Sequence, residues 1–153
     1  MKTIHGNLIT MAPDFDAIVH GCNCFCAMGA GIAKQIKDTW PAAYQADRDT
    51  RKGDKSKLGT YSKADIIIKD KILTIINAYT QYDYGFKRDG LPPVDYFAIR
   101  KVFRQINSDF KGKKIGIPKI GAGLAGGDWS KIQSIIEQET SDLDMTVVEY
   151  NFS

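Results

Sequence analysis

The chain has 153 residues, of which 43% are hydrophobic and 25% are charged, and this composition excludes a disordered, fibrous or disulfide-built protein. A chain of this length can remove roughly 70% of its unfolded surface from water, so we expect residues 1–153 to form one domain. The net charge is only +3 and no apolar run reaches about 18 residues, which argues against a general nucleic-acid reader and against a membrane span.

The first half of the chain alternates short apolar runs with turns that contain glycine or proline. Short β-branched runs favour strands, whereas apolar residues three or four apart favour helices. The Trp40-Pro41 pair ends the first predicted helix, because the residue before proline disfavours helical geometry. In chain order we predict a first strand from Lys2–Ile4 and Asn7–Ile9, a buried strand at residues 16–21, a helix at residues 31–37, a polar helix at residues 42–50, and strand segments at residues 58–62 and 64–68.

The second half contains the strongest periodic signals. Residues 72–78 are dense in β-branched side chains and predict a central strand. Residues 95–110 carry an apolar stripe at helical spacing and predict an amphipathic helix. The other predicted elements are a loop at residues 79–93, a strand at residues 114–118, a helix that Asp128 caps, and a closing strand at residues 145–150.

This alternation of strands and helices places the chain in the α/β class. A helix between most pairs of strands implies a largely parallel sheet that is buried under helices on both faces. In such sheets, ligands bind beyond the carboxyl ends of the strands. Two segments meet this rule, because each follows a predicted strand, contains several glycines and leads into a helix. They are residues 21–31, the first glycine loop, and residues 121–128, the second glycine loop.

Glycine loops at helix starts favour anionic ligands, because the backbone can approach closely and N–H groups are free. Two such loops predict a ligand with more than one anionic or polar segment, such as a nucleotide diphosphate; two unrelated structural turns are the alternative. A Rossmann dinucleotide site is the nearest competitor, but residues 29–34 lack the third glycine of its motif. No lysine-anchored phosphate loop occurs either, so hydride transfer and nucleotide hydrolysis both lose support.

The three cysteines, Cys22, Cys24 and Cys26, lie within five residues and do not form a disulfide framework. Together with His20 they would share one face of an extended strand. One strand holds its ligands in a line and cannot easily wrap a tetrahedral metal ion, so we expect no metal. We interpret the cysteines as small packing residues; a thiolate at Cys24 or Cys26 near a helix start is the alternative.

Four motifs of the chain resemble the macro domain family. They are Gly6-Asn7-Leu8-Ile9, residues 18–24, residues 28–33 and residues 118–129. The motifs occur in order, at separations typical of the family, and across nearly the whole chain. The His-x-Cys-Asn-Cys stretch, the residues around Trp40 and the Gly-Asp-Trp ending look most like the ADP-ribose-1''-phosphate phosphatase branch. The resemblance implies a three-layer α/β/α sandwich with a central, mostly parallel mixed sheet, and it implies no cofactor.

The resemblance also assigns a binding site for ADP-ribose. It implies that the second glycine loop cradles the diphosphate, that the first glycine loop surrounds the distal ribose where the chemistry occurs, and that adenine lies at the far end of the cleft. The expected ligand-binding residues are Asn7, Leu8, Cys22, Cys24, Met28, Gly29, Ala30, Gly31, Ile32, Ile120, Gly121, Ala122, Gly123, Leu124, Ala125 and Gly126.

Three residues are candidates for catalysis: His20, Asn23 and Asp128. The unperturbed pKa of histidine lies near neutrality, and we hypothesise that His20 either attacks the 1''-phosphate or protonates the departing anomeric oxygen; a hydrogen-bonded core histidine is the alternative. Asn23 matches the family asparagine that hydrogen-bonds the distal ribose, and the alternative is a turn residue. Asp128 would orient His20 or position water, or it only caps a helix.

The chain departs from the family pattern at three places. Many macro domains carry an aspartate at position 7 that contacts the adenine amine, whereas this chain has Asn7. Members that react through a lysine adduct carry that lysine after the central strand, but here only Lys87 follows, several residues later. Those enzymes also have an aspartate where this chain has Ala125, which argues against a lysyl mechanism. The long loop at Tyr82–Pro93 is expected to border the cleft.

Three functions remain open at this point. The chain is a phosphatase that releases phosphate from ADP-ribose-1''-phosphate, a hydrolase that removes ADP-ribose from protein or nucleic acid, or a reader that binds ADP-ribose without turnover. We expect ADP-ribose or its 1''-phosphate as the small-molecule partner, no membrane, and no nucleic acid except as an ADP-ribosylated substrate. We expect a monomer. Residues 1–5 lead directly into mixed sequence without an apolar leader, so we expect a cytoplasmic protein.

Overall fold

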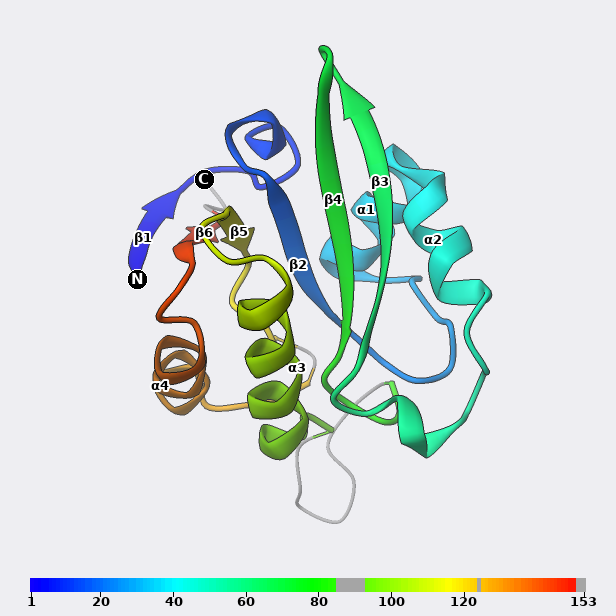
Figure 1. Ribbon diagram of the computed structural model, residues 1–153. Helices are drawn as coiled ribbons and strands as arrows, with labels where there is room; N and C mark the ends of the chain where they lie inside the picture. The colour runs from blue at the N-terminus through cyan, green and yellow to red at the C-terminus, as the bar shows by residue number, and fades with distance from the viewer. Residues whose placement is uncertain (85–92, 124, 151–153) are drawn as a thin grey trace.

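A computed structural model describes residues 1–84, 93–123 and 125–150. It contains one six-stranded sheet in the order β1-β6-β5-β2-β4-β3 (Figure 1). The strands are β1 Lys2–His5, β2 Ala17–Cys22, β3 Tyr61–Ile68, β4 Lys71–Tyr79, β5 Lys114–Ile117 and β6 Asp144–Glu149. The helices are α1 Gly31–Thr39, α2 Pro41–Arg48, α3 Tyr96–Asp109 and α4 Trp129–Glu139, with 3-10 turns at Ala12–Asp14 and Lys55–Lys57. All neighbouring strands are parallel except β3, which pairs antiparallel with β4.

The sheet is the middle layer of an α/β/α sandwich, with α3 and α4 over one face and α1 and α2 over the other (Figure 1). Successive side chains of a strand point to opposite faces, so β2 and β4 each supply both layers. Val19 and Ile76 enter the cluster under α3 and α4, whereas Ile18 and Ile75 enter the cluster under α1 and α2. This alternation makes β2 and β4 apolar along nearly their whole length, as expected for buried parallel strands.

The two glycine loops follow two adjacent strands. β2 and β5 pair directly, with Ala17 opposite Ile115 and Ile18 opposite Gly116. The chain leaves β2 toward α1 on one face of the sheet, and it leaves β5 toward α4 on the other face. A crevice opens beyond the carboxyl ends of two parallel strands where their connections diverge in this way. The fold therefore brings the first and second glycine loops to one edge of the sheet.

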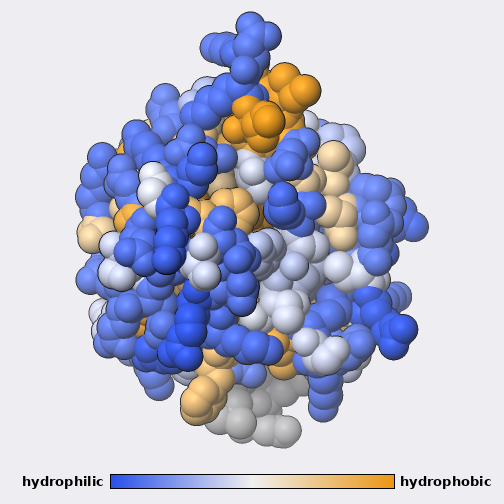
Figure 2. Space-filling view, viewed as in Figure 1, coloured by the Kyte–Doolittle hydropathy of each residue, from blue (hydrophilic) through white to orange (hydrophobic). Residues whose placement is uncertain are grey.

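The surface in the view of Figure 2 is mostly hydrophilic. An apolar patch lies at the tip of the β3–β4 hairpin, where Ile67 and Ile72 face each other in register and are exposed. No helix within residues 1–84, 93–123 and 125–150 is both long and apolar enough to cross a membrane.

Most predicted elements are confirmed within one to three residues, and two strand predictions are wrong. The expected strand segment Asn7–Ile9 is a turn, in which Asn7 caps the backbone, and only β1 forms a strand. Residues 58–60, predicted as strand, follow the 3-10 turn Lys55–Lys57 as a turn, and the rest of the two predicted segments forms one continuous strand, β3. Residues 85–92 of the predicted loop Tyr82–Pro93 lie outside the described residues. Leu124 of the second glycine loop, an expected binding residue, also lies outside them.

Candidate functional site

A cleft lies where the two glycine loops meet, and it consists of two adjoining halves. The inner half has a volume of about 520 Å³ and the outer half about 500 Å³. The two halves share Gly31, Ile32, Pro118, Lys119 and Gly123, so they form one elongated cavity. A cavity of this size and shape suits an extended ligand such as a dinucleotide or a nucleotide sugar.

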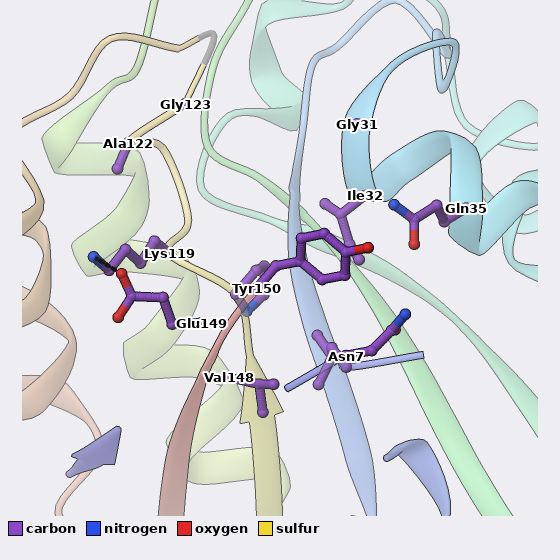
Figure 3. A pocket seen from close by; sticks show the side chains of 12 residues that line it. Asn7, Gly31, Ile32, Gln35, Lys119, Ala122, Gly123, Val148, Glu149 and Tyr150 are labelled. Atoms are coloured by element: carbon purple, nitrogen blue, oxygen red, sulfur yellow. Dashed lines mark hydrogen bonds and ion pairs between the residues drawn. The ribbon is translucent and has the colours of Figure 1, made fainter. Parts of the chain in front are cut away.

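The two halves of the cleft differ in their lining. The inner half is lined by residues in and around the two glycine loops and by two residues that follow β4, Gln81 and Tyr84. The further lining residues of the loop regions are Gly21, Cys22, Asn23, Ala27, Gly29, Ala30, Ala33, Ile120, Gly121 and Ala125. The outer half lies between the turn after β1, α1 and the end of β6, and its further lining residues are Asn7, Leu8, Gln35, Ala122, Val148, Glu149 and Tyr150 (Figure 3). The structure thus brings most of the expected binding residues together.

The N-terminus of α1 faces this cavity without a capping side chain. Ala30 occupies the N-cap position, and its side chain has no atom that can accept a hydrogen bond from the helix, whereas the side chains of Asp95 and Asp128 cap α3 and α4. The first turn of α1, Gly31–Ala33, lines the inner half of the cleft. Uncapped N–H groups and the positive end of the helix dipole favour an anion at this position. The start of α1 is therefore well suited to a phosphate group.

The second glycine loop contains glycines of two different kinds. At Gly121, φ is +75° and an added Cβ would lie 2.8 Å from Cγ2 of Val94, so the backbone needs glycine for conformation and packing. At Gly123 an added Cβ would meet no atom within 4 Å. Because Gly123 lines both halves of the cleft, that open space is the cavity itself. The loop therefore offers a backbone surface to which a ligand can come close.

Asn23 lines the inner half and organises the first glycine loop. Its Oδ1 accepts the N–H groups of Phe25, at 2.9 Å, and Ala27, at 3.4 Å. Its Nδ2 donates to the carbonyl of Ala27 at 2.9 Å, which leaves one amide hydrogen without a partner among the described residues. The turn role that the sequence left as an alternative is present, and a single donor remains for a ligand.

His20 does not line either half of the cleft, and its direct contact with substrate stays a prediction. It is completely buried in β2 and lies on the α1–α2 side of the sheet, whereas Gly21 and Cys22 line the cavity. Its Nε2 lies 2.7 Å from Oδ1 of Asn77, the residue opposite it in β4. Burial lowers the pKa of His20 to about 4, so the ring is neutral at physiological pH. His20 is the hydrogen-bonded core histidine of the alternative interpretation.

A chain of buried hydrogen bonds runs from His20 away from the cleft. Nδ2 of Asn77 donates to the carbonyl of Ala43 at 2.9 Å and to Oγ of Ser62 at 3.0 Å, so Oδ1 of Asn77 must accept from His20. Ser62 then donates to the hydroxyl of Tyr79, 2.8 Å away, because that hydroxyl itself donates to Oδ1 of Asp47 at 2.7 Å. These directions define the proton positions: His20 carries its hydrogen on Nε2, and Nδ1 is free to accept from the thiol of Cys22, 3.7 Å away.

The buried ring of His20 predicts a specific loss of stability in acid. Its pKa is about 4 in the folded protein and near 6.5 in the unfolded chain, so the unfolded state binds the extra proton between these values. The free energy of unfolding is expected to fall by up to about 3 kcal/mol from this residue as the pH drops from 7 to 4. Urea unfolding of the native protein and of His20→Gln, followed across this range, measures the effect. Parallel pH profiles for the two proteins would contradict it.

Several other expected site residues lie outside the cleft. Asp128 is exposed and caps α4 by accepting the N–H of Ser130 at 3.0 Å, and no contact joins it to His20. Cys24 is buried, and burial raises the pKa of its thiol to about 11. Met28 packs in the core beside α1, and Gly126 closes a turn onto Gly123. These four residues do not line the cleft, and their assignment to the site stays a prediction.

Sequence reasoning missed several residues that line the cavity. These are Gln35, Gln81, Lys119, Val148, Glu149 and Tyr150. Gln35 stands one helical turn after Gly31, a spacing that could have indicated it. Lys119 follows β5 directly, and Glu149 and Tyr150 lie at the end of β6, so the rule for carboxyl ends of strands applied to them as well. Tyr84 belongs to the loop expected to border the cleft.

The chain is similar to two curated relatives along nearly its whole length. An uncharacterised 17.5 kDa protein from the tk-vs intergenic region of enterobacteria phage T4 is 32% identical over 155 residues, with 98% of this chain and 96% of the relative covered. An ADP-ribose 1''-phosphate phosphatase from Aspergillus oryzae is 30% identical over 190 residues, with 97% and 92% covered. No model of a protein family matches this chain.

The fold is similar to solved structures as well. The macrodomain of Thermus aquaticus DarG superimposes with a TM-score of 0.72 at 21% identity, and the superposition covers 99% of this chain and 97% of that one. At this level of identity the likeness concerns the fold. It agrees with the mixed sheet between two helical layers seen here.

Proposed function

The chain belongs to the macro domain family, in the branch of the ADP-ribose 1''-phosphate phosphatases, and we propose that it binds ADP-ribose 1''-phosphate in the cleft and hydrolyses it to ADP-ribose and phosphate. The observation that carries this proposal is the uncapped N-terminus of α1 facing the second glycine loop across one cavity. Two anion-binding segments side by side suit a ligand with a diphosphate and a further phosphate.

In this proposal the ligand spans both halves of the cleft. The diphosphate lies where the halves meet, against Gly123 and the first turn of α1. The distal ribose and its phosphate occupy the inner half beside Asn23, whose remaining amide hydrogen can donate to a sugar hydroxyl. The base occupies the outer half, between Ile32 and Val148.

The chemical step consumes one water molecule. Water attacks the phosphorus, the bond between phosphorus and the 1''-oxygen breaks, and the 1''-oxygen ends as a hydroxyl. Backbone N–H groups of the first glycine loop and α1 stabilise the charge on the phosphoryl oxygens. The thiol of Cys22 has a raised pKa because of burial, and His20 is neutral behind β2. We therefore propose that a phosphoryl oxygen of the substrate accepts a proton from the attacking water, and that the departing 1''-oxygen takes up a proton from the phosphoryl group as its bond to phosphorus breaks.

Release of phosphate from ADP-ribose 1''-phosphate tests this proposal. The native protein is expected to release phosphate, and His20→Gln is expected to keep kcat within about tenfold, because a residue outside the cavity acts only through packing. If His20→Gln folds, binds ADP-ribose and yet releases no phosphate, a direct role of His20 returns. If the native protein binds ADP-ribose without phosphate release, the phosphatase proposal is overturned. Loss of ADP-ribose from a modified protein or DNA would then identify a hydrolase, and its absence a reader.

A further inference from the structure

Asn7 presents one half of its amide to the turn and the other half to the cleft. Its Oδ1 accepts the N–H of Ile9 at 2.9 Å and that of Thr10 at 3.4 Å. Its own carbonyl accepts the N–H of Met11 at 3.0 Å and the hydroxyl of Thr10 at 3.1 Å. Only an oxygen can accept a backbone N–H, so this turn determines which end of the amide is which.

The opposite end of that amide is therefore a donor. Nδ2 of Asn7 has no hydrogen-bond partner in residues 1–84, 93–123 and 125–150, and Asn7 lines the outer half of the cleft. In Figure 3 the side chain of Asn7 extends into the cavity on the side of Gln35. A ligand that fills the outer half meets an N–H group here, and rotation of the amide would break both bonds to the turn.

The remaining walls of the outer half suit a flat, weakly polar ring. Ile32 and Val148 are apolar, and the ring of Tyr150 lies across the cavity in Figure 3. The charged pair at the rim is already engaged, because Nζ of Lys119 lies 2.7 Å from Oε1 of Glu149. In Figure 3 this pair lies on the side of the cavity away from Asn7. Gln35 also presents an amide to the outer half, but no side-chain hydrogen bond in the described part of the chain fixes which end of that amide faces a ligand. Asn7 is therefore the amide of fixed direction at the ring edge.

We propose that Asn7 is a specificity-determining residue that reads a hydrogen-bond acceptor on the edge of a purine, so that the cleft takes 6-oxopurine nucleotides as well as adenine nucleotides. This inference rests on the proposed binding of ADP-ribose. Adenine offers a ring nitrogen as acceptor beside its amine, and hypoxanthine offers a carbonyl oxygen at the same edge. An aspartate at position 7 would keep the acceptor for Ile9 and Thr10 but would turn a carboxylate oxygen to the cleft, and it would favour the adenine amine.

Isothermal calorimetry with ADP-ribose and its hypoxanthine analogue, inosine diphosphate ribose, tests the inference. The native protein is expected to bind both with Kd values within about threefold of each other. Asn7→Asp is expected to shift the ratio of the two Kd values by at least about tenfold in favour of ADP-ribose, the worth of one well-made hydrogen bond. Gln138→Glu adds the same charge at an exposed position of α4 that does not line the cleft. This control variant is expected to leave the ratio of the two Kd values unchanged.

The possible results distinguish a failure of the role of Asn7 from a failure of the proposed ADP-ribose binding. A native preference for ADP-ribose above about tenfold, or an unchanged ratio in Asn7→Asp, overturns the role of Asn7 while the proposed function stands. Failure of the native protein to bind either nucleotide overturns the proposed function itself. Because aspartate retains the oxygen that caps the turn, Asn7→Asp is expected to unfold at the same temperature as the native protein, and thermal unfolding checks this.

Discussion

Replacement of Gly123 by valine is expected to weaken ADP-ribose binding by at least about a hundredfold, or about 2.7 kcal/mol, without loss of stability. A Cβ at this position meets no protein atom within 4 Å, so the folded chain accommodates the side chain. The same side chain enters the cavity at the point shared by both halves, where we propose that the diphosphate lies. Calorimetry measures the affinity, and urea unfolding is expected to give a free energy within about 0.5 kcal/mol of the native value.

Gly121→Ala is the matched control, because it changes the same loop for the opposite reason. At Gly121 the backbone has a φ of +75°, and the new Cβ would lie 2.8 Å from Cγ2 of Val94 and 3.1 Å from Cδ1 of Ile132. Left-handed geometry and crowding are expected to lower the free energy of unfolding by about 2–3 kcal/mol. If Gly123→Val binds ADP-ribose as tightly as the native protein, the diphosphate does not lie on this loop.

Replacement of Asn77 by alanine is expected to lower the free energy of unfolding by about 3–5 kcal/mol. Asn77 is completely buried and joins β4 to three other elements through His20, Ala43 and Ser62. Alanine leaves the Nε2–H of His20 without its partner in an interior from which water is excluded, removes the bonds to Ala43 and Ser62, and leaves a cavity. Urea unfolding at pH 7 measures the loss.

Asn107→Ala provides the comparison for Asn77. Asn107 of α3 also makes two side-chain hydrogen bonds, both to Asp142, at 3.0 and 2.9 Å, but it is half-buried and both bonds are exposed to solvent. Water can replace those bonds, so the expected loss is about 1 kcal/mol or less. Equal losses in the two variants would contradict the view that the buried chain from His20 to Asp47 stabilises the join between the sheet and α2.

Local signals in the sequence determined the elements and the kind of site. The apolar stripe of residues 95–110 and the capping aspartates Asp95 and Asp128 specify α3 and α4, because helix geometry depends on neighbours within four residues. The glycine loops could also be predicted from near neighbours in the sequence, because each follows an apolar strand segment and precedes the start of a helix. The turn at Asn7 was missed, because its side chain, rather than strand pairing, satisfies the backbone there.

The sequence by itself thus determined an α/β fold and the place of the two glycine loops, and it predicted an anionic ligand of more than one part. Only the tertiary structure decided which side chains enter the cleft. His20 and Gly21 are neighbours in β2, yet His20 packs against Asn77, 57 residues later, whereas Gly21 lines the cavity. The direction of a side chain in a buried strand depends on pairing and on helices distant in the chain, and no local pattern of residues contains that information.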